Sequence, residues 1–66
     1  MNIDYNKKMV ILLTKYIQEK KVKNMNVIYD SENKRYLLKE DEKIIYKSSS
    51  VENIACRIDI MSFCEN

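Results

Sequence analysis

The chain has 66 residues, which is enough for one domain but too few for a large hydrophobic core. Its 12 basic and 10 acidic residues give a net charge of +2. Histidine and glycine are absent and there are two cysteines, so Ser/His or Cys/His nucleophile pairs, glycine-rich phosphate loops and a four-ligand zinc site are not expected. We therefore expect one domain, 1–66, that is not an enzyme, holds no cofactor or metal, and gains stability as a homo-oligomer, most simply a dimer.

Residue usage is skewed toward amino acids with A/T-rich codons. Ten lysines accompany two arginines, and nine isoleucines accompany one alanine. This bias suggests a low-GC bacterium, its phage or a mobile element. The chain starts with MNID, which lacks the basic region of a signal peptide, and its longest apolar run, 9–13, is far shorter than the ~20 residues of a membrane span. We expect a protein of the host cytoplasm that does not enter a membrane.

The first segment, 4–22, has the apolar spacing of an amphipathic helix, which Asn2 or Asp4 can cap. One face of this helix carries Tyr5, Met9, Leu12, Leu13, Tyr16 and Ile17. Residues 1–23 contain six lysines against two acids, so the helix is also a basic patch. If the protein binds nucleic acid, the predicted contacts are Lys7, Lys8, Lys15, Lys20, Lys21 and Lys23.

The middle segment predicts an antiparallel meander of three strands, 25–29, 34–39 and 43–47. The connections DSENK and KEDEK favour three-residue hairpin loops, in which Asp30 pairs with Lys34 and Lys39 pairs with Lys43. Such a loop needs one residue in the left-handed conformation, which we predict at Asn33 in the first loop and at Glu42 in the second.

This register makes both faces of the small sheet partly apolar. The face expected to meet the helices carries Ile28, Tyr36, Leu38, Ile44 and Tyr46. The other face carries Val27, Tyr29, Leu37 and Ile45, together with Arg35, Lys39, Lys43 and Lys47. A slip of one residue would exchange the two sets.

The last segment predicts a helix over about 50–63. Ser49 and Glu52 have capping-box spacing, and Val51, Ile54, Ala55, Ile58 and Met61 share a helical face. The alternation of Cys56, Ile58 and Ile60 with Arg57 and Asp59 is the competing strand pattern, but the capping box and the length favour the helix.

The two cysteines are expected to be free, packed thiols. Eight residues apart on a helix, Cys56 and Cys64 would lie about 12 Å apart along the axis, which is too far for a disulfide. Free thiols are typical of a reducing compartment.

The sequence therefore predicts an α+β fold of order α-β-β-β-α, with a three-stranded antiparallel sheet and two helices packed on one face. This order resembles the double-stranded-RNA-binding domain. In that family a lysine-rich, alanine-bearing motif at the start of the second helix grips phosphates. The corresponding stretch here, KSSSVENIACR, contains Lys47 and Arg57 but no lysine cluster.

The small size, the A/T-biased usage and the compact α/β body with tyrosines also resemble phage-encoded inhibitors of bacterial defence, of the anti-CRISPR type. The resemblance implies steric inhibition of a host protein or ribonucleoprotein complex. The alternatives are a small nucleic-acid-binding regulator that uses the first helix, and an assembly protein that works only as an oligomer.

The predicted partner surface is the sheet face turned away from the helices, extended by the outer side of the last helix. The other interpretation is that these side chains only complete a small core. The residues of the predicted surface are Tyr29, Arg35, Leu37, Ile45, Lys47, Ile60 and Phe63.

Overall fold

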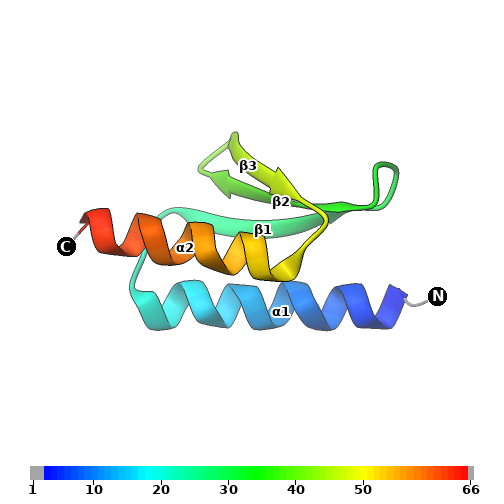
Figure 1. The fold of residues 1–66 in the computed structure, drawn as a ribbon, viewed down its shortest axis with the longest axis horizontal. Helices are drawn as coiled ribbons and strands as arrows, with labels where there is room; N and C mark the ends of the chain where they lie inside the picture. The colour runs from blue at the N-terminus through cyan, green and yellow to red at the C-terminus, as the bar shows by residue number, and fades with distance from the viewer. Residues whose placement is uncertain (1–2, 66) are drawn as a thin grey trace.

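The protein is an α+β domain in which two helices cover one face of a three-stranded antiparallel sheet (Figure 1). The computed structural model describes residues 3–65. The elements in chain order are α1 (Ile3–Lys20), β1 (Met25–Asp30), β2 (Arg35–Glu40), β3 (Lys43–Ser48) and α2 (Val51–Glu65). The predicted fold is confirmed, and the last segment is a helix rather than a strand. The proposed caps fall on Asn2 and on the side chain of Asp4, which lie outside the described residues.

The hydrophobic core lies between the sheet and the helix pair. Leu38 at the centre of β2 and Ile54 and Ile58 on α2 are completely buried. The other members of the core cluster are Leu13, Ile17, Val22, Val27 and Tyr36. Helix α1 packs along β1 and against α2, whereas α2 also packs against β2 and β3.

Helix α1 faces the sheet with a narrower stripe than its apolar pattern indicates. Leu13 and Ile17, four residues apart, point into the core and Val10 packs beside them. Tyr5 and Leu12 were predicted on this face, but both are more than half exposed. They lie roughly 80–100° from Leu13 around the helix, at 100° per residue, so the sheet does not reach them.

The first hairpin turn is one residue longer than predicted. Asp30 pairs with Arg35, not Lys34, and residues 31–34 form the turn. The Asp30 carboxylate accepts hydrogen bonds from the backbone N–H of Glu32 at 3.1 Å and from the side-chain amide of Asn33 at 2.7 Å. Because Asn33 serves as a donor inside the turn, the left-handed residue is Lys34, with φ 55°.

The second hairpin turn is one residue shorter than predicted, and a bulge follows it. Glu40 pairs with Lys43, and Asp41 rather than Glu42 is left-handed, with φ 59°. Aspartate adopts this conformation more readily than glutamate. Between the Lys39–Ile44 and Leu38–Tyr46 pairs the register shifts, so Ile45 is the extra residue of β3.

These two departures exchange residues between the sheet faces. Val27 and Tyr29 pair with Leu38 and Tyr36 and lie on the helix side, where Val27 is buried. Ile28 and Ile44, predicted in the core, lie on the opposite face. The prediction for Tyr36 and Leu38 on the central strand is correct, and the prediction for Tyr46 is correct because the bulge returns it to the helix side.

Helix α2 has the predicted core face but a different cap. The Ser50 hydroxyl accepts a hydrogen bond from the backbone N–H of Asn53 at 3.2 Å, so the cap is Ser50, one residue after the predicted Ser49. The Ser48 hydroxyl accepts from the N–H of Ser50 at 3.0 Å and fixes the entry into the helix. On the flank of α2, the Arg57 guanidinium lies 4.6 Å from the centre of the Tyr46 ring.

The cysteines are free, as predicted, but they are not packed. Cys56 and Cys64 are both exposed, because they lie on the side of α2 away from Ile54 and Ile58.

Candidate interaction surface

The sheet face turned away from the helices is the main candidate surface. Strand pairing places Ile28, Leu37 and Lys47 in one cross-strand row and Asn26, Lys39 and Ile44 in the next. A third row holds Asp30 and Arg35. We call these eight residues the open sheet face.

Three apolar side chains form a stripe across the open sheet face. Ile28 on β1 is 40% exposed and Ile44 on β3 is 48% exposed, whereas Leu37 between them is only 9% exposed. Leu37 does not belong to the core cluster, so its neighbours on this face cover it rather than the helices. Two isoleucine side chains of this small sheet are therefore each about half exposed to water.

The charges around this stripe are mainly positive. Arg35, Lys39 and Lys47 surround it, and Asp30 is the one carboxylate of the open sheet face. The hydrogen bond from Asn33 lowers the pKa of Asp30, which stays ionised but is already occupied inside its turn. An incoming partner therefore meets three cations beside apolar groups.

Arg35 has one group that the fold does not satisfy. Its Nε is buried and has no hydrogen-bond partner among the described residues. A buried donor without an acceptor destabilises a fold by about 1–3 kcal/mol. The guanidinium would thus gain by turning toward a carboxylate, for which its planar donor arrangement is suited.

The predicted partner residues divide into three groups. Arg35, Leu37 and Lys47 lie together on the open sheet face. Tyr29 and Ile45 were predicted there, but both pack against the core. Tyr29 stacks edge-to-face on Tyr36, with ring centres 5.0 Å apart. The two tyrosines are paired because the longer first turn shifts the register of β1 against β2 by one residue.

Ile60 and Phe63 form a separate patch on α2. They border a surface hollow together with Lys20, Asp59 and Ser62, and Phe63 is 84% exposed. The patch lies on the helix layer, so it does not continue the open sheet face (Figure 1).

Five residues of the open sheet face are missing from the predicted surface, although the predicted register already placed Lys39 on this face. They are Asn26, Ile28, Asp30, Lys39 and Ile44. The sequence left the position of Ile28 open, because a slip of one residue in the strand pairing would move Ile28 to the face turned away from the helices. No sequence signal marked the shorter second turn that moves Ile44.

One of the six lysines of the predicted nucleic-acid contact is engaged in a contact between the two helices. Lys20 forms an ion pair with Asp59 at 3.3 Å, and its Nζ lies 5.3 Å from the centre of the Tyr16 ring. Tyr16 also donates a hydrogen bond to Asp59, and this bond lowers the pKa of Asp59. Lys20 thus joins α1 to α2, although its side chain is still 41% exposed. The other five lysines are exposed as well: Lys7, Lys8, Lys15, Lys21 and Lys23.

Neither helix of residues 3–65 is long and apolar enough to cross a membrane. Comparison with protein-family models, with curated proteins and with solved structures finds no match to this chain.

Proposed function

We propose that this protein is a small non-enzymatic inhibitor that covers the surface of a partner protein with its open sheet face. The observation that supports the proposal is the apolar stripe of Ile28, Leu37 and Ile44, bordered by cations on a face that no helix covers. A mixed apolar and charged patch of this kind is typical of a contact surface.

The chemistry of the face indicates the chemistry of the partner. The apolar stripe favours an apolar patch on the partner, and the three cations favour carboxylates around that patch. The unsatisfied Nε of Arg35 favours a carboxylate at its own position. A partner with a lysine-rich surface would be disfavoured by like-charge repulsion.

The composition suggests a setting for such an inhibitor. The small size and the A/T-biased residue usage support an origin in a phage or mobile element of a low-GC bacterium. We propose that the partner is a host protein or ribonucleoprotein complex in the cytoplasm, such as a defence complex of the CRISPR type, and that the inhibitor works by steric blockade.

The test is a pair of single variants used in an affinity capture. Ile44→Glu adds a carboxylate to the open sheet face, and Leu12→Glu makes the same change at a similarly exposed position of α1. Tagged wild-type and variant proteins are incubated with lysate of a low-GC bacterium, with and without nuclease, and captured proteins are identified by mass spectrometry.

We expect one host protein to survive nuclease treatment with wild type and Leu12→Glu and to be lost with Ile44→Glu. Capture that disappears with nuclease would instead support nucleic-acid binding through the lysines of α1. Equal capture by Ile44→Glu and wild type would contradict the open sheet face as the contact. Circular dichroism of both variants checks that the fold is intact.

A further inference from the structure

The two edges of the sheet differ in how they are protected. An edge strand offers unpaired backbone groups to any extended chain, and proteins block it with lysines and bulges. Strand β3 has both devices, since it carries Lys43 and Lys47 and the bulge at Ile45. Strand β1, with the sequence MNVIYD, has neither lysine nor bulge and has a strand neighbour on one side only.

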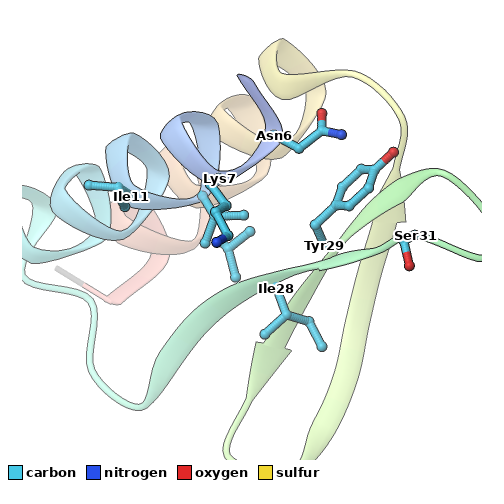
Figure 2. Close-up of a pocket in the computed structure, with 8 residues that line it drawn as sticks. Asn6, Lys7, Ile11, Ile28, Tyr29 and Ser31 are labelled. Carbon is cyan, nitrogen blue, oxygen red and sulfur yellow. The ribbon is translucent and has the colours of Figure 1, made fainter. Parts of the chain in front are cut away.

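An apolar groove runs along this unprotected edge, between β1 and α1 (Figure 2). Its volume is about 550 Å³. Ile11 on α1 and Ile28 on β1 are 54% and 40% exposed beside it. The groove contains one cation and no carboxylate, and its lining is Asn6, Lys7, Val10, Ile11, Val27, Ile28, Tyr29 and Ser31.

We propose that this groove binds an extended acidic and apolar segment of a partner protein, which adds to β1 as a fourth, antiparallel strand. Backbone hydrogen bonds to the edge would supply affinity, and side chains on one face of the segment would supply specificity. The groove shares Ile28 with the open sheet face but otherwise lies on the outer edge of β1 and on α1, and the inference does not depend on the proposed inhibitor function.

The spacing on α1 specifies the order of the segment's side chains. Lys7 and Ile11 are one helical turn apart, which is about 6 Å along the axis. Two residues of a strand span about 6.8 Å on the same face, which nearly matches this distance. Helix α1 runs antiparallel to β1 (Figure 1), so an antiparallel added strand runs in the direction of α1. Its acidic residue therefore precedes its apolar residue by two positions, with the acid at Lys7 and the apolar side chain at Ile11.

Charge favours a foreign segment over a second copy of this chain. Two β1 edges joined about a two-fold axis would bring both α1 helices together, each with Lys7, Lys8 and Lys15 exposed. Like charges would then face one another across the axis. An acidic segment meets the same lysines with opposite charge.

The probe for this proposal is a twelve-residue synthetic peptide of the repeat Glu-Thr-Val-Thr. It is titrated into the full-length, ¹⁵N-labelled protein and followed by two-dimensional NMR. We expect the signals of β1 and of residues 6–11 to shift, while those of β3 stay unchanged. A matched peptide with lysine in place of glutamate should bind at least about tenfold more weakly.

Two pairs of variants decide where the peptide binds. Ile11→Glu should reduce affinity by about tenfold or more, while Leu12→Glu, one residue away and 55% exposed, should leave it unchanged. Lys7→Glu should reverse the preference between the two peptides, while Lys8→Glu should not. Because Lys7 is exposed, this second pair gives an answer even if Ile11→Glu fails to fold.

Three results would overturn the proposal. The first is no shift at millimolar peptide, and the second is shifts centred on β3 or on Leu37 and Lys39 of β2. The third is a dimer in sedimentation analysis that Ile11→Glu converts to monomer, because a second copy would then occupy the edge.

Discussion

Threonine substitutions at two neighbouring residues of β1 test the register on which both proposed surfaces depend. Val27 is 3% exposed and lies on the helix side, whereas Ile28 is 40% exposed and lies on the open sheet face. The three-residue loop expected from the sequence would reverse these positions. Threonine is β-branched like valine and isoleucine, so the strand propensity hardly changes and the effect reports burial of the new hydroxyl.

The structure predicts a clear difference between the two variants. At Val27 the hydroxyl enters the core cluster, where a buried group without a partner costs about 1–3 kcal/mol. At Ile28 the hydroxyl stays in contact with water, and the loss of one partly buried methylene costs about 0.5 kcal/mol. In a domain of this size each kcal/mol lowers the Tm by about 4–8 °C. We expect a fall of roughly 8–16 °C for Val27→Thr at the middle of its range, and about 2–4 °C for Ile28→Thr.

Thermal unfolding followed by far-ultraviolet circular dichroism measures both values. All samples need the same protein concentration, because self-association would make the Tm depend on it. A larger fall for Ile28→Thr than for Val27→Thr would refute the four-residue turn and restore the other set of residues to the open face.

Three further predictions concern the helices. Tyr16→Phe removes the hydrogen bond that lowers the pKa of Asp59. In the wild type this hydrogen bond should stabilise the fold above about pH 4, and the stabilisation should disappear as pH falls below that value. The Tm difference between Tyr16→Phe and wild type, measured from pH 7 to pH 2, should therefore shrink on the acid side; a constant difference would contradict the pairing. Ser50→Ala removes the cap of α2 and should cost about 1 kcal/mol in urea unfolding, with Ser49→Ala as the matched control that costs little. Both Cys56 and Cys64 should react with a thiol reagent in the folded protein about as fast as in denaturant, and slow labelling would mean that they are covered by another chain.

The helices and strands could be predicted because each has a local sequence signal. Apolar residues recur at helical spacing in α1 and α2, and the turn-forming clusters separate three short strands. The central strand was assigned correctly on both faces: Leu38 is buried in the core, and Leu37 is on the open sheet face. Leu38 is paired on both sides, so its position does not depend on the length of one turn alone.

The edge strands were less predictable, because their faces depend on turn geometry. The bonds from Glu32 and Asn33 to Asp30 add one residue to the first turn, and nothing in the alternation of β1 distinguishes the two registers. The bulge at Ile45 depends on how β3 pairs with β2, and not on the sequence of β3 alone. Both features arise from contacts between residues that a periodic pattern does not record.

In a chain without glycine, other residues must adopt the left-handed conformation at turns and helix ends, and this lowers the stability of the fold. Lys21, Asn24, Lys34 and Asp41 have φ between 55° and 63°. Asparagine and aspartate tolerate this conformation, but for lysine it costs on the order of 1 kcal/mol or more. The total stability of a domain this small is only about 3–10 kcal/mol. In the absence of glycine, Lys21 and Lys34 are two positions where a single glycine should make the protein measurably more heat-resistant without touching its core or either proposed surface.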